Sequence, residues 1–183
     1  MSEQRRPADP SPAADEVDEV THAVLAASQL LASIGSRALA AAGYGGRDGH
    51  GVTPAQFRML EVLVAHGHVK LVALAGAMAV NPSTAMRMVD RLIAAGLADR
   101  RPNRENRRET SLTATDSGLR LVAAVTARRR AETAAALARL GPAERAVLVG
   151  ALGAFTAAGA QPAEGGPHAF PDLLGCAGPY VLG

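Results

Sequence analysis

The sequence is poor in cysteine, aromatic residues and long apolar runs. Its 183 residues include one Cys, no Trp and only 3% aromatic residues. A single cysteine excludes a disulfide framework and any zinc site built from several cysteines. Few aromatic rings are available to stack on a large cofactor, so we expect no cofactor. No apolar stretch follows Arg5 and Arg6, and no continuous run of ~18 apolar residues occurs. We therefore expect no signal peptide, no transmembrane helix and a cytoplasmic location.

Basic residues are concentrated after residue 20, and almost all of them are arginine. Residues 1–20 hold two Arg and six acidic residues, a net charge of −4, which leaves 17 basic and 11 acidic residues, a net charge of +6. Lys70 is the only lysine in the sequence. The guanidinium fork of arginine matches phosphate groups and the edge of guanine. This balance favours nucleic acid as a partner, although a GC-rich genome produces the same arginine bias.

The chain divides into a helical domain, expected over 15–158, and two tails. Residues 1–14 are rich in Pro, Ser and charge and predict a disordered lead. Residues 159–183 hold six Gly and four Pro, so we expect no regular structure there. Apolar residues recur at helical spacing in three long segments, 15–42, 115–140 and 142–158.

The middle of the chain predicts three shorter helices followed by a β-hairpin. Thr53-Pro54 begins a helix, because Thr53 and Gln56 can form a capping box and proline fits the first helical position. A short helix follows over 71–78, and Asn81-Pro82 then begins a longer helix that ends at Gly96. The hydrophobic period changes after this point, which predicts two short strands around a polar loop, 97–100 and 109–113.

A short helix, a tight turn, a second helix and a basic hairpin together predict a winged helix-turn-helix that binds DNA. The helix after Asn81 is long enough to enter a major groove with its first turn against the base edges. Five of the nine residues in 100–108 are arginine, against one glutamate, which suits phosphates or a narrow minor groove. Side chains that the core does not need become candidate DNA contacts: Ser83, Thr84, Met86, Arg87, Arg91, Arg104, Arg107 and Arg108.

The chain contains three stretches in a fixed order: VTPAQFRMLEVLVAHG (52–67), LVALAGAMAVNPSTAMRMVDRLIAAGLADR (71–100) and RPNRENRRETSLTATDSG (101–118). In this order they resemble the MarR family of bacterial transcriptional regulators. The resemblance implies a mainly α-helical fold with a small β-hairpin wing, and a homodimer joined through terminal helices that binds a near-palindromic operator. It also implies a cleft for a small-molecule effector between the dimer helices and the DNA-binding lobe, which we expect at about 52–113. Our candidates for the lining of this cleft are Tyr44, Phe57 and neighbouring apolar residues.

The wing departs from the family pattern. The resemblance implies that Arg108 is the family's minor-groove arginine, but the family usually has Asp two residues earlier, where this chain has Asn106. An amide holds a neighbouring arginine less firmly than a carboxylate does, although Glu105 offers a substitute. The leading hypothesis is a dimeric, sequence-specific repressor that responds to a small ligand. The alternative is a dimeric protein-interaction module that kept the fold and lost DNA binding.

Other candidate chemistry carries little weight. His66 and His68 have no nearby Cys or paired carboxylate, which favours an incidental pair over a metal site. Cys176 lies in the tail, whereas peroxide-sensing members of the family place a cysteine in the first helix. Residues 128–130 are three arginines in mid-helix, which indicates a solvated face or a set of salt bridges. No phosphate-binding glycine loop or nucleophile elbow occurs, so we expect no enzyme.

Overall fold

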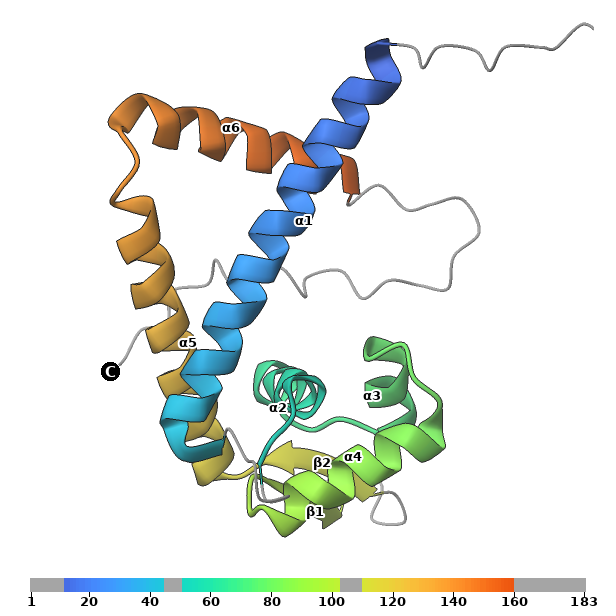
Figure 1. Cartoon of the computed structure of the whole chain (residues 1–183). Coiled ribbons are helices and arrows are strands. Elements are labelled where there is room, and N and C mark those ends of the chain that lie inside the picture. Colours follow the sequence, from blue (N-terminus) through green and yellow to red (C-terminus); the bar gives the residue numbers. More distant parts are fainter. Residues whose placement is uncertain (1–11, 45–50, 103–109, 160–183) are drawn as a thin grey trace, which may run out of the picture.

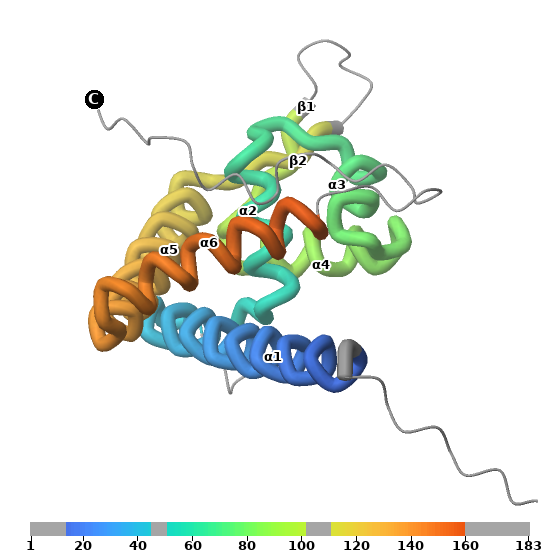
Figure 2. The backbone as a smooth tube through the Cα atoms, turned by 90° about the horizontal axis from the view of Figure 1, so that it is seen from above, coloured from blue at the N-terminus to red at the C-terminus, as the bar shows by residue number. Residues whose placement is uncertain are grey.

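The computed structural model describes residues 12–44, 51–102 and 110–159, which form seven helical segments and a β-hairpin. The elements are α1 (Pro12–Leu39), a π-helical turn η1 (Ala40–Tyr44), α2 (Pro54–His66), α3 (Leu71–Ala77), α4 (Pro82–Ala94), β1 (Ala98–Pro102), β2 (Thr110–Ala114), α5 (Asp116–Leu137) and α6 (Pro142–Gly159). We call α2, α3, α4 and the hairpin the lobe, and α1, α5 and α6 the stem. Figure 1 shows the lobe beside the lower parts of α1 and α5. From above, α1 and α6 extend as two separate arms (Figure 2). The predicted class, mainly α with a small β-hairpin, is confirmed.

Capping side chains fix where the lobe helices begin. Thr53 Oγ1 accepts from the Gln56 N–H at 3.2 Å, and Gln56 Oε1 accepts from the Thr53 N–H at 2.9 Å, so the predicted capping box is confirmed. Thr115 caps α5 by accepting from the Gly118 N–H at 3.1 Å. Each such bond satisfies a backbone donor that has no partner inside its helix.

The core lies where α2, α4, the hairpin and the first turns of α5 meet. Its largest fully buried side chains include Met59, Leu60 and Leu63 of α2. Gly118 allows α5 to approach closely, because a Cβ built at this position would lie 2.2 Å from the Leu97 carbonyl oxygen. Glycine is therefore required here by space, and the start of α5 is tightly seated in the lobe.

The hairpin is joined to the lobe by a third extended segment. β1 and β2 pair antiparallel with Arg100 opposite Leu112. Leu112 also forms an isolated bridge with Val69, whose N–H and C=O bond to it at 2.9 and 2.8 Å. β1 begins at Ala98 and not at Leu97, because the Leu97 N–H bonds to the Leu92 carbonyl and completes the end of α4.

The long helix α1 begins at Pro12, earlier than predicted, because proline fits the first turn of a helix. Residues 1–11 of the predicted lead and 160–183 of the predicted tail lie outside the described residues. By length and composition, the helix from Ala14 to Tyr44 could cross a membrane. The sequence did not predict this, because polar residues interrupt the apolar ones and no long continuous apolar run occurs. One such helix is weak evidence of a membrane span. Only 17% of its most apolar 18-residue stretch is buried within this chain.

Candidate nucleic-acid interface

The turn between α3 and α4 sets the start of the candidate recognition helix. Ala79 adopts a left-handed conformation with φ 52°, and its N–H bonds to the Gly76 carbonyl at 3.0 Å. Val80 N–H bonds to the Ala75 carbonyl at 3.0 Å. Asn81 Oδ1 then accepts from the Thr84 N–H at 2.8 Å and caps α4. This chain of bonds orients the first turn of α4 on the lobe.

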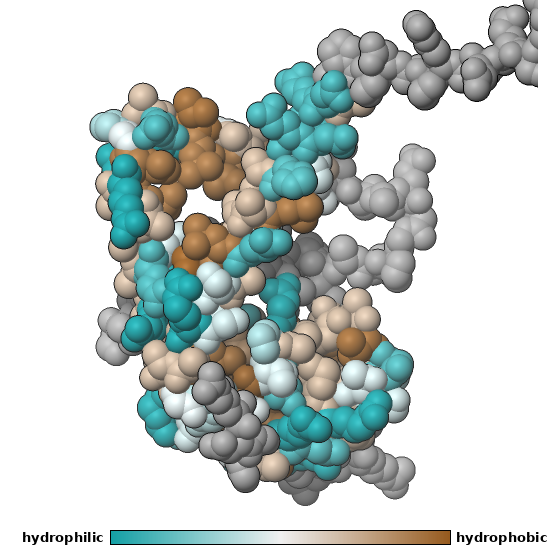
Figure 3. Space-filling view, viewed as in Figure 1, coloured by the Kyte–Doolittle hydropathy of each residue, from teal (hydrophilic) through white to brown (hydrophobic). Residues whose placement is uncertain are grey.

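One face of α4 anchors the helix and the other faces solvent. Ala85, Val89 and Leu92 are buried at a spacing of three and four residues. Figure 3 shows hydrophilic side chains gathered over α4. The predicted contact residues that the structure describes lie away from the buried stripe: Ser83, Met86, Arg87 and Arg91 are exposed, and Thr84 is half-buried. Their contacts with DNA stay a prediction.

Hydrogen bonds within the first turns of α4 orient two of these side chains. Ser83 Oγ donates to Asn81 Oδ1 at 2.8 Å, so its proton is committed to the cap. The hydroxyl oxygen of Ser83 still offers lone pairs to a donor on a base edge. Arg87 Nη2 donates to Thr84 Oγ1 at 3.4 Å, which holds the guanidinium along the outer face of the helix.

A contact between α4 and β1 was not anticipated from the sequence. Arg100 Nη2 donates to Asp90 Oδ1 at 2.5 Å and to Met86 Sδ at 3.1 Å. In the same strand, Arg101 Nε pairs with Asp99 Oδ2 at 2.8 Å. A signal for Asp90 was present, because it follows the solvent-facing Met86 by four residues and so shares its face. The remaining predicted wing residues, Arg104, Arg107 and Arg108, lie outside the described residues, as does Asn106.

Ion pairs connect the stem helices to the lobe and to one another. Arg129 of α5 pairs with Glu61 of α2 at 3.1 Å, and Arg37 and Arg128 both pair with Glu132, at 3.0 and 3.1 Å. Burial raises the pKa of Glu61 above its ordinary value, against the opposing effect of Arg129. The hydrogen bond from Arg37 lowers the pKa of Glu132. Two of the three consecutive arginines thus form salt bridges within the chain.

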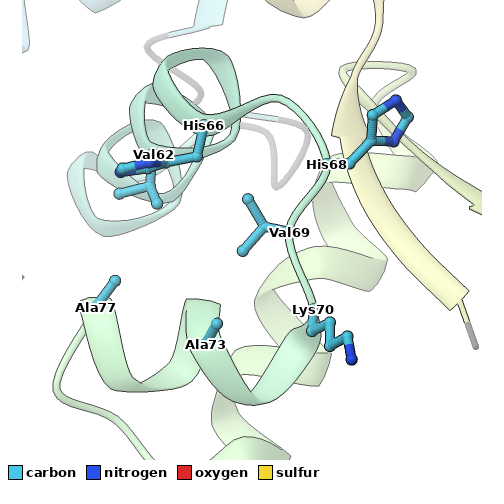
Figure 4. Close-up of a pocket in the computed structure, with 7 residues that line it drawn as sticks. All are labelled: Val62, His66, His68, Val69, Lys70, Ala73 and Ala77. Atoms are coloured by element: carbon cyan, nitrogen blue, oxygen red, sulfur yellow. The ribbon is translucent and has the colours of Figure 1, made fainter. Parts of the chain in front are cut away.

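A shallow pocket of about 370 Å³ lies between the end of α2 and α3. Val62, Val69, Ala73 and Ala77 face a common space in Figure 4, with His66 beside Val62, whereas the side chains of His68 and Lys70 point outward. His68 Nδ1 lies 3.3 Å from Ser111 Oγ on β2. The wall of the pocket is therefore mainly apolar.

Two further predictions concern ligands. Phe57 is buried in the core and Tyr44 is half-buried against it, and neither lines the pocket beside α3. The structure therefore does not bring these two residues to that pocket. Within residues 12–44, 51–102 and 110–159, no group of three His, Cys, Asp or Glu side chains could hold a metal ion.

Comparison with known proteins assigns this architecture. A model described as the MarR family matches residues 52–110, from just before α2 to the first residue of β2. The structure of RV1404 from Mycobacterium tuberculosis is 40% identical in sequence, and the similarity covers 85% of this chain and 99% of that one with a TM-score of 0.71. The chain belongs to the MarR family. MarR-family proteins are transcription regulators, so the predicted family and the prediction of a regulator that is no enzyme are confirmed.

Two other relatives give this MarR-family chain a functional context. The HTH-type transcriptional repressor MdtR of Bacillus subtilis strain 168 is 43% identical over 68 residues, which are 37% of this chain and 44% of MdtR. The match thus spans less than half the length of that curated relative. A structure titled for the regulation of DNA binding of Bordetella bronchiseptica BpsR by 6-hydroxynicotinic acid is 27% identical, covers 75% of this chain and 92% of its own, and has a TM-score of 0.52.

Proposed function

We propose that this chain is a cytoplasmic, dimeric repressor that binds a specific DNA operator and is released by a small-molecule effector. The observation that carries the proposal is the outer face of α4, where Ser83, Arg87 and Arg91 lie exposed on a helix capped by Asn81. A helix presented in this way can enter the major groove, where arginine distinguishes guanine by its two acceptors. Arg104, Arg107 and Arg108 of the wing would follow the phosphates and the minor groove.

Dimerisation is supported by the apolar side chains that the stem leaves uncovered. Figure 3 shows apolar surface along α6 and toward the middle of α1. Apolar patches of this kind commonly mark protein interfaces. The exposed large apolar side chains of these two helices are Val17, Val20, Leu25, Leu30, Leu31, Val147, Val149, Leu152 and Phe155. A second copy related by two-fold symmetry would cover them and would present two α4 helices to half-sites ~10 base pairs apart or a multiple of that.

The same apolar residues explain why α1 resembles a membrane span. Four acidic residues lie near its start, within 15–19, and Ile34, Ala38 and Leu39 near its end are buried within this chain. A second copy of the chain would therefore bury the exposed apolar side chains in the middle of the helix, and no membrane is needed to do so. We therefore propose a cytoplasmic protein, with a domain over 15–158 and its DNA-binding lobe over 52–113.

Repression and effector binding are proposed from the relatives. MdtR is named a repressor, and the BpsR title describes control of DNA binding by a small aromatic acid. In this chain, a second copy would close the space between stem and lobe, where Tyr44 packs against the core. We propose that Tyr44 and Phe57 belong to the wall of an effector cleft there, and this places the cleft apart from the pocket beside α3.

Selection of duplexes from a random DNA pool tests the proposed function directly. The selected site should be a near-palindrome, and binding should weaken steeply as salt rises because phosphate contacts release counterions. Arg87→Ala should cost about 1–3 kcal/mol and relax preference at one position in each half-site. No enrichment of any sequence, together with an intact dimer by light scattering, would instead favour the protein-interaction module for which Asn106 is the sequence argument.

A further inference from the structure

Asp90 lies on the face of α4 that would meet DNA, although its charge opposes binding. Its side chain is exposed, and it lies four residues after Met86 and directly before Arg91. α4 contains no other Asp or Glu. A carboxylate on such a surface repels the phosphates of any duplex, whatever its sequence. The position of Asp90 therefore indicates a role other than raising affinity.

Arg100 links this carboxylate to the wing strand. Its guanidinium bonds to Asp90 Oδ1 and to Met86 Sδ, so one side chain of β1 is held against two successive turns of α4. The backbone N–H of Arg100 is itself bonded to Asp99 Oδ1 at 2.8 Å. The guanidinium is thus oriented before any DNA arrives, and binding does not have to order it.

We propose that Asp90 is a specificity-determining residue, which positions Arg100 and lowers the affinity for DNA of unrelated sequence. The inference rests on the proposed DNA-binding function. Non-specific complexes depend almost entirely on the number of phosphates that the protein neutralises. Pairing with Asp90 leaves one arginine fewer to neutralise phosphates. At the correct site, Arg100 is already oriented, so its contact with DNA does not lose conformational entropy of the side chain.

The pair contributes little to folding, which separates its role from a structural one. The Arg100 and Asp90 side chains are 44% and 53% exposed, and exposed ion pairs add little to the stability of a protein. Replacing either residue should therefore leave the thermal unfolding midpoint unchanged. The effect of either replacement should appear in the ratio of the affinities for specific and for unrelated DNA.

The test compares the dissociation constants of the full chain for a duplex selected from a random pool and for a shuffled duplex of equal composition. For Asp90→Asn, binding to the shuffled duplex should tighten about 3–10-fold, while binding to the selected duplex should change less than about 2-fold. The salt slope on the shuffled duplex should steepen by about one. Asp90→Glu keeps the charge and should restore most of the ratio.

Two control variants separate charge from positioning. Asp18→Asn removes the same charge from an exposed position on α1, and its specificity ratio should equal that of the wild type. Asp90→Asn combined with Arg100→Gln restores the net charge, so affinity for the shuffled duplex should return to the wild-type value while the ratio stays low. Equal changes on both duplexes for Asp90→Asn would overturn this inference and leave the proposed function standing. A wild-type chain that prefers no duplex would overturn both.

Discussion

The lobe and the stem of this chain bury apolar surface in opposite ways. In the lobe, Met59, Leu63 and Leu74 are fully buried by elements of the same chain. In the stem, Leu31 is 50% exposed and Phe155 is 55% exposed, and α6 has no buried residue. The burial of apolar side chains therefore stabilises the lobe within a single chain, whereas a large apolar surface of the stem is left exposed to water. A folding unit and a proposed interface can thus be distinguished within one polypeptide.

The largest expected effect comes from removing a core side chain of the lobe. Leu63→Ala should lower the free energy of unfolding by about 2–5 kcal/mol, because the substitution leaves a cavity in a packed core. Leu31→Ala is the matched stem variant, and its effect should depend on protein concentration, because the proposed dimer would cover this side chain. Chemical denaturation over a hundredfold range of concentration measures both. Concentration-independent losses of equal size would remove the distinction between lobe and stem.

A second comparison uses two glycines. Gly118→Ala would place a Cβ against the Leu97 carbonyl and the Leu60 side chain, at 2.2 and 3.1 Å, so α5 must shift. We expect a loss of about 3 kcal/mol from this overpacking. Gly35→Ala in α1 meets its nearest atom, Arg129 Nε, at an ordinary 3.7 Å and should gain about 0.5–1 kcal/mol in helix stability. Thermal unfolding of the two variants should shift in opposite directions.

A smaller effect is expected at the turn between α3 and α4. Ala79→Gly should stabilise the lobe by about 0.5–1 kcal/mol, because glycine adopts a positive φ without the cost that alanine pays. Gly96 has φ 71° after α4, so Gly96→Ala is the reciprocal variant and should destabilise by about 1 kcal/mol. The unfolding midpoints in urea measure both changes. A loss of stability in Ala79→Gly would mean that the entropy of the unfolded chain outweighs strain at this turn.

The smallest effects concern the pH dependence of two glutamates, Glu61, which joins the lobe to the stem, and Glu132, which joins two stem helices. The pKa of Glu61 is raised from 4.5 by burial. The favourable contribution of Glu61 to the free energy of unfolding is therefore present below that value and is lost as pH rises. The pKa of Glu132 is lowered from 4.5, first by its bond with Arg37, so its contribution is present above that value and is lost as pH falls. The stability of Glu61→Gln relative to wild type should therefore rise with pH, and that of Glu132→Gln should fall. Slopes of the same sign would contradict this assignment.

Local signals in the sequence were enough for most of the fold. The capping box at Thr53 and the cap at Asn81 could be predicted because donor and acceptor lie three residues apart. The exposed face of α4 followed from the spacing of its buried residues. Contacts between distant residues left no such signal: Arg129 meets Glu61 across 68 positions, and Arg100 has several acidic residues within reach in sequence besides Asp90. Pairs of this kind depend on packing, which periodicity does not encode.

Predictions that required knowing what covers a surface were also weaker. The resemblance to a family suggested Phe57 for an effector cleft, and this stays a prediction, while the structure buries Phe57 in the core. The pocket beside α3 is lined by Val62 of α2, Ala73 of α3 and Val69 of the extended segment between them. None of these residues carries a chemical signature that separates a pocket wall from a core. The sequence therefore predicted the exposed face of α4 more readily than it predicted any small-molecule site.

The seating of α5 in the lobe makes this helix a lever. Gly118, Leu121 and Val125 of its first turns are buried, whereas the rest of the helix runs out into the stem. With 22 residues, α5 is about 33 Å long, so a tilt of about 5° at the Gly118 pivot displaces its far end by about 3 Å. A displacement of that size where α5 joins α6 thus corresponds to a small rotation of the lobe. The close approach at Gly118 leaves little slack in which such a rotation could be absorbed.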